Sequence, residues 1–180
     1  RQKLSTLFPV DSRYGWDLQH APHRALLDKV RNTLKPLFKW SAPDCRRWSS
    51  ATNGNDQAVL EKARKEEIPM LQWYVEDCVA QHMAGRGYGA ENGLRSQIWT
   101  KSPLSTLHRR ADGRTSRTDA CRHGLEDANK LPYLKSYRFE SNIAIRTARK
   151  ICGGHGLIQH SKLEGGHNTA KTAVYTPRLC

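Results

Sequence analysis

The C-terminal tail holds the densest group of residues that could bind a metal ion. Cys152 and His155 form a Cys-x2-His pair, and His160, His167 and Cys180 follow it. Zinc is held by thiolates and imidazoles in tetrahedral sets, and this spacing could supply half of one. A structural site usually repeats a tight pair, and no second pair follows. The sequence therefore predicts no metal or other cofactor. If a metal binds, its candidate ligands are Cys152, His155, His160 and His167.

The same stretch resembles a segment of a known enzyme family. The run 148–156, which contains Cys-Gly-Gly-His-Gly, is similar to a turn in the C-terminal helical domain of acyl-CoA oxidases, and 173–177 is similar to a later segment of that family. The resemblance implies a helix before Gly153, with the glycines near a flavin and an acyl-CoA. No acidic residue follows 173–177, where the family has a glutamate. An enzyme fragment of this kind is one alternative function.

A second resemblance suggests a nuclease. His160 together with Gly165-Gly166-His167-Asn168 is similar to part of the pattern of His-Asn-His nucleases. In that family a histidine activates water beside a divalent metal. The final histidine of the pattern is missing here, and no ββα arrangement can be read around it. A small metal-dependent nuclease is therefore a further alternative.

The segment from Tyr133 to Cys152 has the clearest helical periodicity in the chain. At 100° per residue, apolar residues fall on one broad face and cations on the opposite face. We expect a helix over these residues. Its cations would recur about every 5.4 Å, one helical turn, and could meet several phosphates of a nucleic acid strand. The predicted cationic stripe consists of Lys135, Arg138, Arg146, Arg149 and Lys150.

Two further basic segments could contact nucleic acid. A loop predicted over 109–122 has no apolar anchors and crowds like charges that a polyanion would screen. Near residue 48, an Arg-Arg-Trp run could grip phosphate and stack on a base, unless Trp48 is part of the core. The additional candidate RNA-binding residues are Arg109, Arg110, Arg114, Arg117, Arg46, Arg47 and Trp48.

The net charge points to a polyanionic partner. The 180 residues carry 30 Lys and Arg against 17 Asp and Glu, a formal charge of +13, and residues 101–180 hold 15 of the basic and 6 of the acidic residues. Phosphate backbone is the commonest partner of such an excess. We expect a non-catalytic, basic RNA-binding component of a ribonucleoprotein assembly, such as an organellar (mitochondrial) ribosomal protein, that binds structured RNA and neighbouring proteins.

The cysteines and the hydropathy bear on location. Five cysteines form no CxxC pair and are odd in number, which favours a reducing compartment such as the mitochondrial matrix over a disulfide framework. No apolar run approaches the roughly 20 residues needed to cross a bilayer, so we expect no membrane span.

The elements that must position these residues look helical. We predict a mainly α fold of about four helices, because no segment shows sustained strand alternation. One helix begins at Pro22 and should end or kink at Pro36. A second begins near Asn55, and Pro69 should interrupt it or open a further helix that ends near Gly85. The expected organisation is an extended arm over 1–21, a helical domain over 22–152 with the basic loop 109–122, and an irregular Gly/His-rich tail over 153–180.

Overall fold

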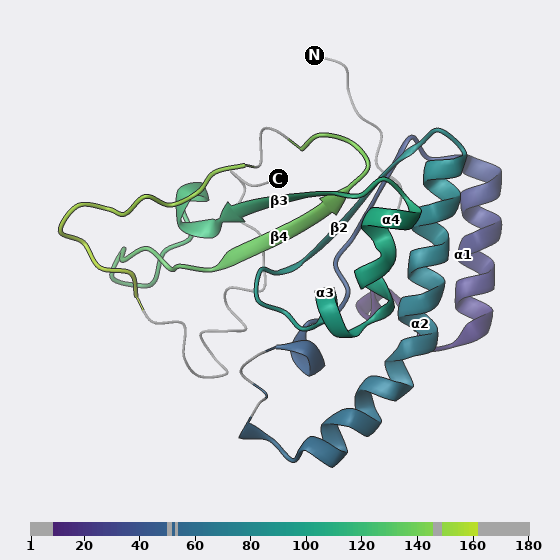
Figure 1. Ribbon diagram of the computed structural model, residues 1–180, viewed down its shortest axis with the longest axis horizontal. Helices are drawn as coiled ribbons and strands as arrows, with labels where there is room; N and C mark the ends of the chain where they lie inside the picture. Colours follow the sequence, from purple (N-terminus) through teal and green to yellow (C-terminus); the bar gives the residue numbers. More distant parts are fainter. Residues whose placement is uncertain (1–8, 50–51, 53, 146–148, 162–180) are drawn as a thin grey trace. The chain divides into compact units, whose positions relative to one another are not determined.

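The computed structural model describes residues 9–49, 52, 54–145 and 149–161 (Figure 1). The chain divides into two compact units, Arg1–Pro36 and Leu37–Cys180. Within the described ranges, no helix combines the length and the apolar character needed to cross a lipid bilayer.

The first unit contains one helix, α1 (Ala21–Leu34), after a short 3-10 turn, η1 (Ser12–Tyr14). Pro22 lies in the first turn of α1, where its missing N–H costs no hydrogen bond. The helix ends before Lys35, which has a left-handed backbone with φ of +47° and is followed by Pro36. The predicted helix from Pro22 is thus confirmed, with its end set by the Lys35–Pro36 pair.

The second unit is built on a mixed four-stranded sheet, so the prediction of a mainly α fold is wrong and the fold is α+β. The strands are β1 (Phe38–Ser41), β2 (Gly87–Gly93), β3 (Arg114–Asp119) and β4 (Ser136–Ser141). Their order is β1-β2-β4-β3, with β1 parallel to β2 and the other two pairs antiparallel (Figure 1). The parallel pair is joined through α2 (Gln57–Met83), as such a pair requires a crossover connection.

The larger core lies between α2 and one face of the sheet. Asp56 caps α2 by accepting from the Ala58 and Val59 amides, and the helix continues through Pro69 without a break. Three short helical turns complete this layer: α3 (Ile98–Lys101), η4 (Pro103–Thr106) and α4 (Leu107–Arg110). Ser102 caps η4, as its place before Pro103 predicts. The buried core residues here include Trp48, Leu71, Val75, Cys78, Tyr88, Ile98 and Leu107.

A smaller core lies on the opposite face, where Tyr137 and Phe139 of β4 are buried. The segment after β3 covers them with Ala120, Leu125 and Tyr133. β4 therefore separates two interiors: its aromatic residues face the smaller core, and the residues between them, Arg138 and Glu140, lie on the α2 side.

The predicted helix from Tyr133 to Cys152 is wrong. Residues Ser136–Ser141 form β4, and the described residues on either side of it, 133–135, 142–145 and 149–152, contain no helix. Tyr137 and Phe139 alternate with Arg138 and Glu140, which is the period of a strand, and strand pairing on both sides of β4 prevails over the helical period of the longer window. The loop predicted over 109–122 is also wrong in its centre, where β3 is followed by the 3-10 turn η5 (Ala120–His123).

Candidate functional site

The cations of the predicted stripe do not share one surface. Arg138 lies within β4, Lys135 precedes it, and Arg149 and Lys150 lie after the sheet has ended. Lys135 is half-buried, with its ammonium 5.2 Å from the centre of the Tyr137 ring. Arg146 is outside the described residues. A single rigid helix face that meets successive phosphates is therefore not present in the described part of the chain.

The arginines of the sheet are held by buried acids. Arg117 and Arg138 lie directly opposite each other on β3 and β4. Arg117 pairs with Asp119 at 3.0 Å and Arg138 with Glu140 at 2.9 Å, and both carboxylates are almost completely buried. Like charges opposite each other in a sheet repel, and these two acids offset that repulsion. The positive charge of both arginines is thus largely neutralised inside the protein.

Other predicted RNA-binding arginines also have acidic neighbours. Arg110 forms a two-pronged pair with Glu76 at 2.7 Å for both contacts. Two more arginines pair with an acid two residues earlier in the chain: Arg46 with Asp44 and Arg114 with Asp112. These pairs are at least partly exposed and each contributes about 1 kcal/mol or less to stability, so a phosphate could compete for them.

Trp48 belongs to the core, which settles the alternative left open by the sequence. Its side chain is 1% exposed, and its indole N–H donates to Glu67 Oε2 at 2.7 Å. Arg47 pairs with the same carboxylate at 3.3 Å. Burial raises the pKa of Glu67, although the Trp48 hydrogen bond and the Arg47 charge act in the opposite direction. Trp48 is therefore not available to stack on a base.

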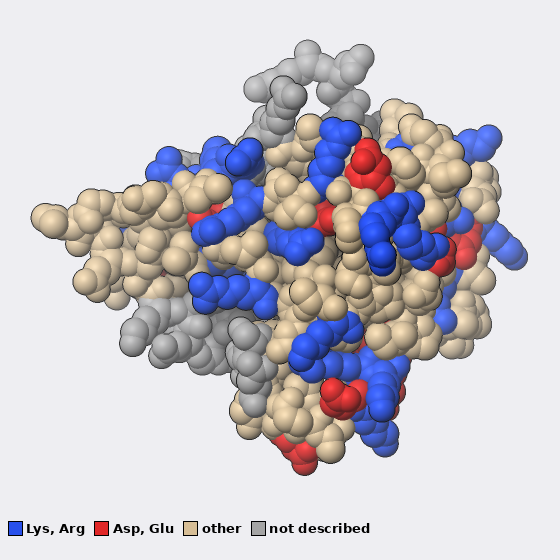
Figure 2. Space-filling view, viewed as in Figure 1, with Lys and Arg blue, Asp and Glu red and all other residues tan. Residues whose placement is uncertain are grey.

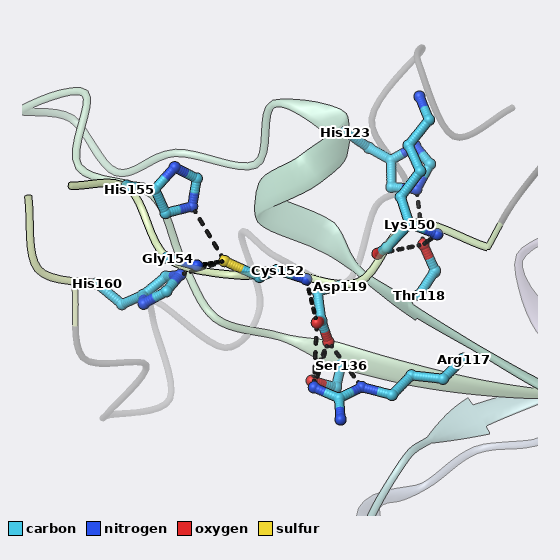
Figure 3. Close-up of polar contacts among 10 residues, drawn as sticks. All are labelled: Arg117, Thr118, Asp119, His123, Ser136, Lys150, Cys152, Gly154, His155 and His160. Carbon is cyan, nitrogen blue, oxygen red and sulfur yellow. Dashed lines mark hydrogen bonds and ion pairs between the residues drawn. The ribbon is translucent and has the colours of Figure 1, made fainter.

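A cluster of four potential metal ligands forms beyond the end of β3. The thiols of Cys121 and Cys152 and the imidazoles of His155 and His160 place their ligand atoms within 4.8 Å of one another. Cys152 Sγ lies 3.4 Å from His155 Nε2 and 3.5 Å from His160 Nε2 (Figure 3). The two imidazole rings are nearly perpendicular, with an interplanar angle of 78°. Three of the four residues come from one short segment, and the fourth comes from η5.

A buried carboxylate positions the segment that carries Cys152. Asp119, at the end of β3, is fully buried and accepts from the Cys152 amide at 2.8 Å, from the Ser136 hydroxyl and from Arg117 (Figure 3). Burial would raise the pKa of Asp119, but these donors outweigh it and hold the pKa below its usual value. Two residues before Cys152, the Lys150 carbonyl accepts from the Asp119 amide at 2.9 Å.

The turn after Cys152 directs both histidines toward its sulfur. The Gly154 amide donates to Cys152 Sγ at 3.3 Å. Gly154 has φ of +104°, a backbone conformation that residues with a Cβ rarely adopt. This turn is the structural reason for the Cys-Gly-Gly-His spacing seen in the sequence.

Cys121 is the member of the cluster that sequence reasoning missed. It is 8% exposed, and burial, reinforced by the neighbouring Cys152, raises its pKa to about 11. Cys121 precedes β4 in the chain and is 31 residues from Cys152, so no short spacing pattern connects it to the histidines of the tail. Of the predicted candidates, Cys152, His155 and His160 are brought together, and His167 lies outside the described residues.

Three exposed cations are close in the chain to the cluster residues. Arg122 follows Cys121 in the chain, and Arg149 and Lys150 lie shortly before Cys152. None of the three forms an ion pair with another residue in the described ranges. The nearby Asp119 is neutralised by Arg117. The backbone bond between Asp119 and Lys150 brings the segment of Arg149 and Lys150 to the end of β3 that Arg122 follows.

The two resembled enzyme families gain no support from the local geometry. The stretch from Arg149 to Cys152 is not helical, so the helix implied by the acyl-CoA oxidase resemblance is not seen in the described residues before Gly153. The Gly-Gly-His-Asn part of the nuclease resemblance and the 173–177 segment lie outside the described residues. Comparisons of the chain with models of known protein families, with curated proteins and with solved structures found no match, so similarity assigns it to no family.

Proposed function

We propose that this protein is a non-catalytic RNA-binding component of a ribonucleoprotein assembly, and that it contacts the phosphate backbone beside the Cys/His cluster. The observation that carries the proposal is that Arg122, Arg149 and Lys150 are exposed and belong to two segments that meet at the end of β3, where the Lys150 carbonyl accepts from the Asp119 amide. Guanidinium and ammonium groups without an acidic partner are free to exchange solvent for phosphate.

The wider surface is consistent with this partner. The chain has a formal charge of +13. Figure 2 shows Lys and Arg side chains spread over the region of β3 and β4, with few acidic side chains visible among them. Arg109 of α4 is exposed and could extend the contact beyond the cluster. A surface of this kind binds through many phosphate contacts and reads RNA shape rather than base sequence.

The location within the cell belongs to the same proposal. The described cysteines, Cys45, Cys78, Cys121 and Cys152, are all free thiols. Thiols persist in reducing compartments, and we propose the mitochondrial matrix as one that also contains large ribonucleoprotein assemblies.

The test is a binding measurement with a charge-matched control. The test variant is Arg122→Ala/Arg149→Ala/Lys150→Ala. The control, Lys29→Ala/Lys62→Ala/Lys65→Ala, removes the same charge from exposed positions of α1 and α2 that are not among the candidate RNA-binding residues. Affinity for a labelled RNA hairpin is measured by fluorescence anisotropy between about 50 and 200 mM salt.

The proposal predicts different results for the two variants. The test variant should bind the RNA at least about tenfold more weakly than the wild type. The slope of log affinity against log salt concentration should also be less steep by up to about 2.7, because up to three phosphate contacts are lost. The control should keep more than half of the wild-type affinity. Equal weakening by both variants would show that only net charge matters, and an affinity of the wild type that does not change with salt would overturn the proposal.

A further inference from the structure

We infer that Cys121, Cys152, His155 and His160 bind one zinc ion and that this ion is structural. The inference does not depend on RNA binding. It rests on the ligand types, on the distances between their atoms and on the residues that hold them in place.

The distances match those of a tetrahedral zinc site. Zn–S bonds of about 2.3 Å and Zn–N bonds of about 2.0–2.1 Å at the tetrahedral angle place sulfur and nitrogen about 3.5 Å apart. The two Cys152–histidine distances are 3.4 and 3.5 Å. The same geometry separates two sulfurs by about 3.8 Å, inside the 4.8 Å that encloses all four ligand atoms.

The arrangement fits one metal ion rather than an iron–sulfur cluster. Rieske-type clusters also use two cysteines and two histidines, but the cysteines bind one iron and the histidines the other. Ligands of different irons are further apart than ligands of the same ion. Here both imidazole nitrogens lie beside the sulfur of Cys152, so thiolate and imidazoles would share one ion.

The ligand chemistry favours zinc among the single ions. Two thiolates and two imidazoles in a tetrahedral set are typical of zinc. Binding releases one proton from each thiol, and the two thiolates formed balance the two charges of Zn²⁺. The product is a neutral centre, which suits a site where Cys121 is buried.

The four protein ligands complete the coordination shell. A catalytic zinc keeps one position for water or substrate, whereas a structural zinc is closed by four side chains. Two hydrogen bonds fix the position of Cys152: the Asp119 carboxylate accepts from its amide, and the Gly154 amide donates to its sulfur. The ion would therefore tie the segment 149–161 to η5 and the end of β3.

The test uses the full-length protein produced in zinc-supplemented medium. Metal content is measured by elemental analysis and should be about one zinc per chain. Removal with a chelator followed by cobalt(II) should give the intense visible bands of a tetrahedral cobalt–thiolate centre, which addition of zinc abolishes. Cobalt spectra and metal content of refolded wild-type protein provide a readout even if some variants fold poorly.

Single variants identify the ligands. Cys121→Ser, Cys152→Ser, His155→Ala and His160→Ala should each lose most of the zinc. Cys45→Ser and His108→Ala, matched changes at an exposed cysteine and an exposed histidine outside the cluster, should retain it. His167→Ala should retain it as well, because the cluster already supplies four ligands.

Several results would overturn the inference. Wild-type protein without zinc and without a tetrahedral cobalt spectrum would refute the site. A different bound metal would refute zinc, and a Cys121–Cys152 disulfide detected by mass spectrometry would remove both thiolates. Loss of zinc from His167→Ala would reassign the fourth ligand.

Discussion

The substitution of Asp119 by alanine tests how the end of β3 holds the ligand-bearing segment. The carboxylate is fully buried and accepts from three groups: the Cys152 amide, the Ser136 hydroxyl and the Arg117 guanidinium. Alanine leaves the amide and the hydroxyl without an acceptor, at about 1–3 kcal/mol each. Arg117 is 40% exposed and can turn to water, so its loss adds little. The two donors together predict a cost of about 4 kcal/mol, the middle of a range of about 2–6 kcal/mol.

Two companion variants separate these contributions. Arg117→Ala removes only the half-exposed ion pair and should cost less than about 1 kcal/mol. Asp119→Asn keeps one acceptor oxygen of similar shape and should cost about 1–2 kcal/mol, between the other two. The three variants thus rank by what they do to buried donors rather than by the charge they remove.

The assay is equilibrium urea unfolding followed by far-UV circular dichroism, with all proteins under identical metal conditions. A domain stable by about 5–15 kcal/mol keeps a measurable folded state after a loss of this size. If Asp119→Ala costs less than about 1 kcal/mol, or no more than Arg117→Ala, the carboxylate does not hold the segment and the reasoning is refuted.

Three further predictions concern metal, pH and packing. If zinc is present at about 1,000 times its Kd, it stabilises the fold by about 4 kcal/mol, so excess chelator should lower the melting temperature by about 8–16 °C. An unchanged melting temperature would contradict a structural zinc. Burial raises the folded-state pKa of Glu67, so this carboxyl stabilises the fold less as pH rises through that pKa. The melting temperature of Glu67→Gln relative to that of the wild type should therefore be higher at pH 7 than at pH 4. The opposite dependence on pH would refute this account of Glu67. Gly89→Ala should cost about 1–3 kcal/mol, because its Cβ would lie 2.5 Å from the Trp40 ring. Gly93→Ala, with nothing within 4 Å, is the control, and equal costs in urea unfolding would show that the ring contact is unimportant.

Helix ends could be predicted from sequence because their signals are local. Pro22 in a first turn, Ser102 before Pro103 and the stop at Lys35–Pro36 each act through neighbouring backbone groups. Pro69 misled the prediction of a break, since α2 runs through it. Its neighbours on both sides are helical and packed on the sheet, and tertiary packing offsets the cost of one proline.

The strands could not be predicted in the same way. β2 reads Gly-Tyr-Gly-Ala-Glu-Asn-Gly, which has low strand propensity. Two of its glycines are explained only by the neighbouring strand, because the rings of Phe38 and Trp40 lie where a Cβ at Gly87 or Gly89 would be. This need for glycine arises only when the two strands pair, so it produces no periodic pattern in the sequence.

The four-residue cluster shows why metal ligands are hard to find by spacing alone. The Cys-Gly-Gly-His turn is a local signal and was visible in the sequence. β4 ends beside Arg114, at the far end of β3 from Cys121. Cys152 comes near Cys121 only because the chain after β4 returns to Asp119, to which the Lys150 carbonyl and the Cys152 amide are hydrogen-bonded. Such tertiary contacts leave no spacing pattern in the sequence.

The net charge of +13 overstates the charge available to a partner, because many arginines pair with acids inside the described chain. The exposed cations close in the chain to the Cys/His cluster are Arg122, Arg149 and Lys150, and an ion bound by Cys121 and Cys152 would hold together the two segments that carry them. Zinc would then affect RNA binding by fixing where the cations lie and not by adding charge, since the proposed centre is neutral. Removal of the ion should weaken RNA binding without altering the net charge of the surface, whereas loss of RNA binding by mutation of the cations should leave the zinc in place.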